Sequence, residues 1–161
     1  MLSHLRILGS SLILAASILL SLTLVHRSRK REAEYDALCA LLRHIRDNID
    51  CFMTPIGTIL ESFNSEPLKQ CGFSRVMCEE GLSAAAASGF LSVSDEAVGL
   101  LIEFADGLGI GLRDEEMRRC EYYFGCMREL AEAEHNRAKN CAKLYMYLPP
   151  LAALSLIIVL I

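Results

Sequence analysis

The chain has 161 residues, enough for one domain or for one domain with membrane anchors. It is 53% hydrophobic with a mean hydropathy of +0.33, which is high for a soluble domain, and its formal net charge is −4. Residues 27–143 carry 15 Lys and Arg residues against 20 Asp and Glu residues, which disfavours binding to nucleic acid. Basic protein surfaces are the more natural partners of such a segment.

The first predicted element is an apolar helix near the N-terminus. Residues 7–25 hold no charge, and as a helix these 19 residues would be about 28 Å long, close to the roughly 30 Å hydrocarbon core of a bilayer. The run ends in HRSRKR rather than in the small residues of a cleavage site, which favours an uncleaved anchor over a signal peptide. We therefore expect a transmembrane anchor over residues 1–26.

Basic residues flank both apolar runs of the sequence. Those after the first run are Arg27, Arg29, Lys30 and Arg31, and those before the second are Arg137, Lys139 and Lys143. Because Lys and Arg accumulate on the cytoplasmic side of membrane anchors, we expect the segment between the runs, 27–143, to be cytoplasmic. A stop-transfer flank explains the first cluster, which implies no specific lipid site.

The segment 27–143 is predicted to be entirely helical. From about Arg29, apolar residues recur every three or four positions, as in a helix that packs along its length against another: Tyr35, Leu38, Leu42, Ile45, Ile49 and Phe52. The same spacing recurs from Met117 to Tyr145, where Glu134 interrupts it. The two long helices could pair antiparallel, or each could pack on the shorter helices between them.

Four shorter helices are expected between the long ones. Their predicted N-terminal residues are Thr54 as a cap with Pro55 at the first position, Ser65 with Pro67, Ser83, and Ser94. The last of them should end in the glycine-rich turn 107–111, and no window alternates as a strand would. The predicted fold is all-α: a compact bundle of about six helices between N- and C-terminal transmembrane helices.

The last predicted element is a second apolar run, over 144–161. Its 18 residues are uncharged, but Pro149 and Pro150 should break its start, so a buried core helix or a re-entrant hairpin would also explain it. The strongly apolar ending LSLIIVLI favours a second transmembrane segment. Both termini would then lie across the membrane from the central domain.

The residue types that carry catalysis or bind metals are present but do not form a recognisable site. The seven cysteines are odd in number and lack a CxxC pair, so we interpret them as reduced, structural residues. His44 and His135 fall off the apolar stripes, where solvated side chains are expected. The GLGIG turn lacks the spacing of a phosphate loop, and the acids 114–116 fit a helix start better than a metal site. We expect no catalytic residue, cofactor, metal or small-molecule substrate.

Three short motifs support a resemblance to a known family. Residues 48–56, NIDCFMTPI, are similar to the motif E-I-x-Y-x-x-T-P-L, and later segments are similar to an LG turn followed by Asp and to K-x-Y-x-x-L-G. The matching positions are Ile49, Thr54 and Pro55 in the first motif, Leu108, Gly109 and Asp114 in the second, and Lys143 and Tyr145 in the third. In motif order, anchor placement and length the chain resembles the stage III sporulation protein AB family. Asn48, Cys51 and Pro149 depart from the family's Glu, Tyr and Gly, which indicates a divergent member.

The resemblance implies a role in endospore formation, within a transenvelope complex at the membrane around the engulfed forespore. It implies a soluble domain similar to the cytoplasmic domain of the type II secretion platform protein, facing the mother-cell cytoplasm. The implied partners are the other subunits of the stage III complex, including its secretion-type ATPase, and the lipid bilayer. The implied function is assembly and coupling rather than catalysis.

Two other functions remain open from the sequence. The chain could be a platform subunit of a secretion or pilus system of ordinary growth, which would keep the scaffold role outside sporulation. It could instead be a membrane-bound redox or metal-dependent enzyme that uses its cysteines.

Overall fold

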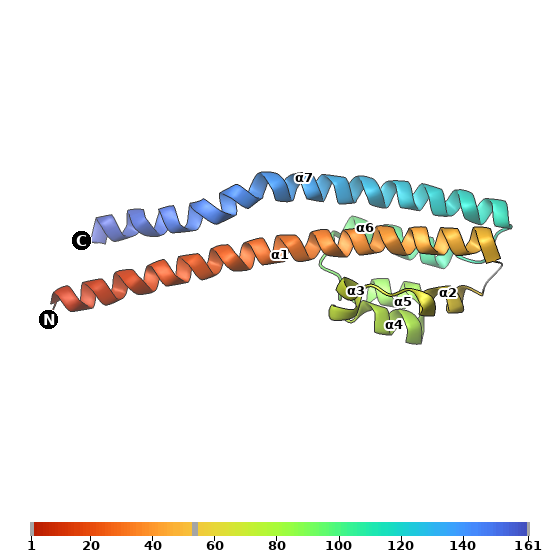
Figure 1. Cartoon of the computed structure of the whole chain (residues 1–161), viewed down its shortest axis with the longest axis horizontal. Helices are drawn as coiled ribbons and strands as arrows, with labels where there is room; N and C mark the ends of the chain where they lie inside the picture. The colour runs from red at the N-terminus through yellow and green to blue at the C-terminus, as the bar shows by residue number, and fades with distance from the viewer. Residues whose placement is uncertain (1, 53–54, 161) are drawn as a thin grey trace. The chain divides into compact units, whose positions relative to one another are not determined.

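The computed structural model describes the backbone of residues 2–52 and 55–160, and the side chains of 12–13, 15–49, 55–141, 144 and 147–155. In this part of the chain every regular element is an α-helix, which confirms the predicted all-α class (Figure 1). The described helices are α1 (Leu2–Phe52), α2 (Ile56–Ser62), α3 (Glu66–Gln70), α4 (Phe73–Glu80), α5 (Leu82–Ala87), α6 (Asp95–Asp106) and α7 (Arg113–Leu160).

The chain divides into two compact units. Lys30–Glu134, called here the helical domain, holds the second part of α1, the five short helices and the first part of α7. Met1–Arg29 and His135–Ile161 together make the second, called here the terminal unit.

The core of the helical domain lies along α1. Tyr35, Leu38, Leu42 and Ile45 are buried as predicted from their spacing, and Ile49 is partly buried against the same core. Leu41 is also fully buried, so the apolar face of α1 is wider than a seam between two helices. That width fits contact with both α7 and the short helices, which contribute Leu68, Phe73, Met77, Ala85, Leu101 and Phe104 to the core.

Within the helical domain, α1 and α7 run antiparallel. Arg31 forms an ion pair with Glu134, whereas Arg43 lies 5.2 Å from the centre of the Phe124 ring. Further along α1, Arg46 interacts electrostatically with Glu121. Residue numbers therefore rise along one helix as they fall along its partner, and the buried Cys120 and Met127 place α7 in the common core. The sequence left open whether the long helices pair with each other or pack on the short helices between them. In the helical domain both kinds of packing occur.

The structure has five short helices where four were expected. The segment that Ser65 begins is divided into α3 and α4 because Gly72, between them, has a φ of +86°, which a helix cannot contain. A second difference lies at Pro55, which is the N-cap of α2 rather than its first residue; Thr54 lies outside the described residues. The predicted Ser94 cap is confirmed, since its Oγ accepts a hydrogen bond from the Ala97 amide at 3.3 Å.

The predicted solvated state of His44 is wrong. Its Nε2 lies 3.2 Å from the Ile59 carbonyl oxygen and 3.0 Å from Ser62 Oγ, and its ring centre is 5.4 Å from that of Phe63. Asn48, one turn later, donates its side-chain amide to the His44 carbonyl at 2.8 Å. These contacts attach α2 to the end of α1, so His44 fastens two elements that the sequence pattern could not pair.

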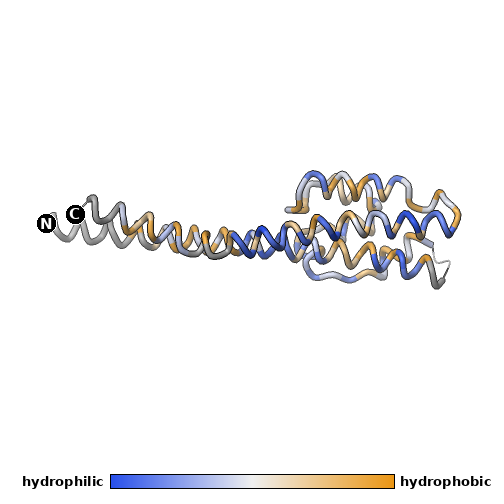
Figure 2. The backbone as a smooth tube through the Cα atoms, turned by 90° about the horizontal axis from the view of Figure 1, so that it is seen from above, coloured by the Kyte–Doolittle hydropathy of each residue, from blue (hydrophilic) through white to orange (hydrophobic). Residues whose placement is uncertain are grey.

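In the terminal unit, the described parts of α1 and α7 expose many large apolar side chains. They include Leu12, Leu19 and Leu22 from α1, and Leu144, Leu148 and Leu151 from α7, each more than half exposed; Figure 2 shows the hydrophobic colour along these stretches. The prediction that Pro149 and Pro150 break the last helix is wrong. α7 continues through both prolines to Leu160. Within the described residues, no helix holds a stretch long and apolar enough to cross a membrane.

Candidate functional site

The two motif segments of the helical domain meet at one place. Gly109, in the turn between α6 and α7, has a φ of +86°, and a Cβ built on it would come within 2.5 Å of Ile56 Cδ1. Any side chain at residue 109 would therefore be strained by its backbone, and the end of the Ile56 side chain would have to shift to admit it. The start of α2 and the LG turn thus pack together although Ile56 and Gly109 are 53 positions apart, and Leu108 also packs against the core.

Carboxylates at the start of α7 hold the rest of this turn. Glu116 is 5% exposed and accepts a hydrogen bond from the Gly111 amide at 2.9 Å, and Glu115 accepts one from the Leu112 amide at 3.3 Å. Arg119 donates to the Gly107 carbonyl oxygen. These contacts join the turn to the first two turns of α7.

The remaining motif residues have different surroundings. Asp114 is exposed in the first turn of α7, where its charge complements the helix dipole as predicted. Pro55 is exposed and Ile49 is partly buried in the core. Lys143 and Tyr145 belong to α7, but their side chains lie outside the described part. The motifs of the helical domain therefore mark a packed corner rather than a reactive cleft.

The predicted juxtamembrane basic cluster divides into two pairs. Arg27 and Arg29 are exposed and belong to the terminal unit. Lys30 Nζ lies 3.7 Å from Glu34 Oε1, and Arg31 Nε lies 3.3 Å from Glu134 Oε1. Lys30 and Arg31 therefore contribute to the helical domain itself, a role that the interpretation as a stop-transfer flank did not include.

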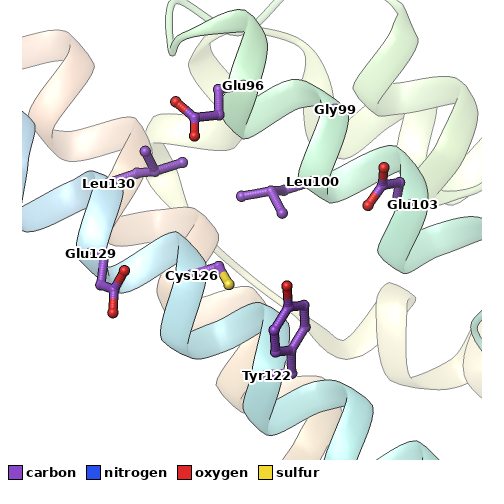
Figure 3. A pocket seen from close by; sticks show the side chains of 8 residues that line it. All are labelled: Glu96, Gly99, Leu100, Glu103, Tyr122, Cys126, Glu129 and Leu130. Atoms are coloured by element: carbon purple, nitrogen blue, oxygen red, sulfur yellow. The ribbon is translucent and has the colours of Figure 1, made fainter.

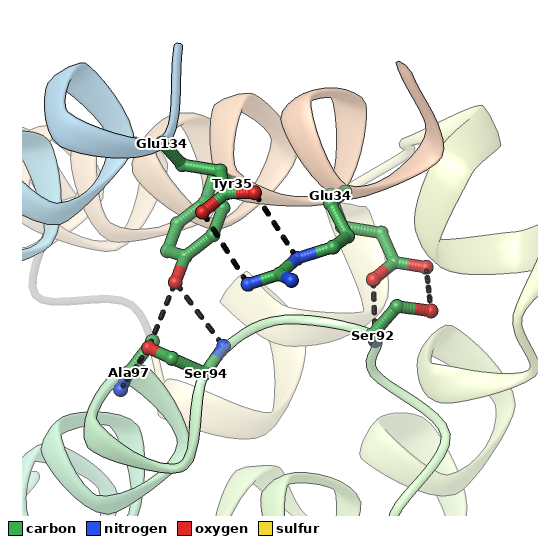
Figure 4. A network of polar contacts seen from close by, with 7 residues as sticks. Glu34, Tyr35, Ser92, Ser94, Ala97 and Glu134 are labelled. Atoms are coloured by element: carbon green, nitrogen blue, oxygen red, sulfur yellow. Dashed lines mark hydrogen bonds and ion pairs between the residues drawn. The ribbon is translucent and has the colours of Figure 1, made fainter. Parts of the chain in front are cut away.

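A polar network that sequence reasoning missed joins α1 to the segment between α5 and α6 (Figure 4). Glu34 is fully buried, and its carboxylate accepts a hydrogen bond from the Ser92 amide at 2.6 Å. Next to it, the Tyr35 hydroxyl lies 2.8 Å from Ser94 Oγ and accepts from the Ser94 amide at 3.1 Å. Since Ser94 also caps α6, the network fixes where α6 starts relative to α1. In the sequence, the only indication that Glu34 is buried is its position next to Tyr35, at the edge of the apolar face of the helix.

A groove of about 410 Å³ lies between α6 and α7 (Figure 3). It is called here the acidic groove, and its lining residues are Glu96, Gly99, Leu100, Glu103, Tyr122, Cys126, Glu129 and Leu130. In Figure 3 Leu100 of α6 and Leu130 of α7 point toward one another. Three carboxylates and two leucines line one open space, together with the Tyr122 hydroxyl and the Cys126 thiol, which hydrogen-bond to each other.

Burial keeps two of the cysteine thiols protonated. Desolvation raises the pKa of Cys39 to about 11, and the neighbouring Asp36 adds to the effect; burial likewise raises the pKa of Cys120 to about 11, with Glu116 contributing. Such thiols are poor nucleophiles at neutral pH, because the thiolate is the reactive form. Among the described residues, no group of three or more His, Cys, Asp or Glu side chains is placed to hold a metal ion.

Comparison with known proteins gives one match. The family model described as stage III sporulation protein AB matches residues 6–161, essentially the whole chain. No curated protein and no solved structure matched. The match covers the three motifs, both apolar runs and the helical domain described above. The chain belongs to the stage III sporulation protein AB family.

Proposed function

We propose that the chain is a non-enzymatic, membrane-anchored platform subunit of a sporulation-specific, secretion-like transenvelope complex, needed for forespore development. The observation that carries the proposal is the family match over residues 6–161. The helical domain supports a scaffold role because its motif residues build a packed corner and its acidic groove suits a partner. The proposed activity needs no cofactor, nucleic acid or small-molecule substrate.

The membrane location rests on the terminal unit and on the sequence. Residues 7–25 and 144–161 are uncharged, and large apolar side chains of the described parts are exposed, among them Leu19, Leu22 and Leu151. Each Å² of apolar surface left in water costs about 25 cal/mol, so a lipid environment would stabilise this unit. Contiguous exposed apolar surface is typical of membrane or protein contact. We place the unit in the mother-cell membrane around the forespore, with the helical domain in the cytoplasm.

The proposed partners are other subunits of the stage III sporulation complex, in particular its secretion-type ATPase. A helical domain with 10 Lys and Arg residues against 20 Asp and Glu residues has a strong negative field. Such a field favours basic surfaces of cytoplasmic proteins and steers their approach.

The test is deletion of the gene in a spore-forming host. We expect engulfment to begin and heat-resistant spores then to be lost, with recovery when the full-length chain is supplied in the mother cell. Microscopy of membrane-stained cells and counts of heat-resistant colonies measure the two effects. A normal spore yield from the deletion strain would contradict the proposal.

The two alternatives are separated by further readouts. Transcripts confined to mother cells support the sporulation role, whereas transcripts throughout growth indicate a platform for a vegetative system. A variant with all seven cysteines replaced by Ala or Ser should still restore sporulation, apart from some lost packing. Loss of spores from a stably accumulating variant of this kind would favour the cysteine-dependent enzyme.

A further inference from the structure

The acidic groove is lined by three carboxylates and by no basic side chain. Glu96 and Glu103 come from α6 and Glu129 from α7, and no Lys or Arg is among the residues that line the groove. Two arginines of α7 have partners outside the groove: Arg128 pairs with Glu132 at 2.8 Å, and Arg119 donates to the Gly107 carbonyl. Burial raises the pKa of Tyr123 above its ordinary value, the charge of Glu103 adds to this effect, and the charge of Arg119 opposes it.

The floor of the groove is apolar and partly uncovered. Leu100 and Leu130 are half-buried, and the ring of Tyr122 is 65% exposed. Between the two glutamates of α6 lies Gly99, and a Cβ added there would meet no other atom within 4 Å. A glycine in the middle of a helix is unfavourable, and packing within this chain does not require it here. Its effect is to leave the floor open for another backbone or side chain.

The spacing of the charges suits a helix as the occupant. Glu96 and Glu103 are seven residues apart on α6, about two turns or roughly 10 Å along the axis. Basic side chains at heptad spacing on a docked helix would meet both carboxylates, while an apolar residue between them would reach Gly99 and Leu100. A second copy of this domain suits the groove less. Each copy carries 20 acidic and 10 basic residues, so two copies would repel each other.

We propose that the acidic groove between α6 and α7 is the docking site for a basic amphipathic helix of a partner protein. Lys or Arg side chains of that helix pair with Glu96, Glu103 and Glu129, and its apolar face packs on Leu100, Leu130 and Tyr122. The proposal rests on the platform function above, since it names the site at which that platform holds a partner.

Site-specific photocrosslinking in sporulating cells tests the site. The full-length chain would carry p-benzoylphenylalanine in place of Tyr122, an aromatic side chain that is 65% exposed at the groove, or, as a control, at the exposed residue 57 of α2, where a Cβ meets no atom within 4 Å. We expect an adduct from residue 122 alone, and mass spectrometry should place its partner peptide in a Lys- or Arg-rich segment with an apolar stripe. No adduct, an adduct with a second copy of this chain, or an adduct with an acidic or uncharged segment would each overturn the proposal.

Charge reversal provides the matched variants. E103K with E129K should lower the yield of the residue-122 adduct at least about tenfold, because like charges across an interface oppose binding. E61K with E80K reverses two exposed glutamates of α2 and α4 and should leave the yield unchanged. Equal yields from both double variants would refute the docking site.

A floor-filling variant separates docking from folding. Gly99→Leu removes a helix-breaking residue, so its melting temperature should equal or exceed that of the parent, while its adducts from a probe at residue 96 should fall about tenfold. Undiminished adducts would count against the site. Normal spores from the deletion strain would contradict the platform function. If the deletion strain forms no spores but the G99L and E103K/E129K variants restore full spore yield, only the groove proposal is contradicted.

Discussion

Glu34 places a carboxylate in the interior of the helical domain. Its side chain is fully buried, and it accepts the Ser92 amide at 2.6 Å, while Lys30 supplies a partly exposed counter-charge. Glu34→Ala would leave the Ser92 N–H without an acceptor and open a cavity beside Tyr35. We expect the free energy of unfolding to fall by about 2–3 kcal/mol, measured by urea denaturation of the purified full-length chain.

The control for Glu34 is a glutamate without such contacts. Glu61→Ala, on the exposed side of α2, should change the unfolding free energy by less than about 0.5 kcal/mol. If the two substitutions cost the same, the buried network does not stabilise the domain.

The cysteines differ in their expected reactivity. Cys39 and Cys120 have their pKa raised to about 11, whereas Cys78 is exposed. Two units of pKa leave about a hundredfold less thiolate at pH 8, so single-cysteine variants should react with iodoacetamide far more slowly at residues 39 and 120 than at 78. Rapid alkylation of Cys120 in the folded chain would contradict this.

The same shift has a consequence for stability. Because the folded pKa is raised, the neutral thiol is the form that folding favours, so this contribution is complete below about pH 9 and is lost as the pH rises toward 11. Cys120→Ala should make the decline of unfolding free energy between these pH values shallower, as denaturation at each pH would measure.

At the scale of elements, glycine conformation decides where helices end. Gly72 has a φ of +86° and separates α3 from α4, and a Cβ there would meet only Phe90 at 3.9 Å. Gly72→Ala should therefore cost about 1 kcal/mol through backbone strain alone. The same substitution at Gly99, inside α6, should stabilise by about 0.5–1 kcal/mol.

This pair of variants has a clear measurement. Thermal and urea unfolding of the full-length chain should give shifts of opposite sign for Gly72→Ala and Gly99→Ala. Two destabilising results would mean that residue 99 is constrained by something other than helix propensity.

The helical elements were the most predictable part of the fold, since their signals are local. Tyr35, Leu38, Leu42 and Ile45 follow a spacing that one helix must bury on one face, and the Ser94 cap depends on residues three positions away. The division at Gly72 was missed because glycine permits a helix as well as a positive φ, and only packing around it decides. The continuation of α7 through Pro149 and Pro150 was also missed, because proline ordinarily breaks or kinks a helix.

At the scale of the whole molecule, sites built from distant segments were beyond sequence reasoning. The motif residues Ile56 and Gly109 meet across 53 positions, and Glu34 contacts Ser92 across 58. The acidic groove combines Glu96 and Glu103 with Glu129 of another helix, so no single periodic pattern contains it. The excess of acidic residues in 27–143 did indicate a basic partner, but not the surface that would receive it.

The last prediction concerns the orientation of the chain in the membrane. If the helical domain is cytoplasmic, trypsin added to intact spheroplasts should leave it whole, and trypsin added after permeabilisation should cut after exposed residues such as Lys69 and Arg75. An epitope tag placed after residue 161 should be removed from intact spheroplasts only if residues 144–161 cross the bilayer. Cleavage of the helical domain from outside would reverse the proposed orientation, and a protected tag with a protected domain would reduce the membrane attachment to a single crossing.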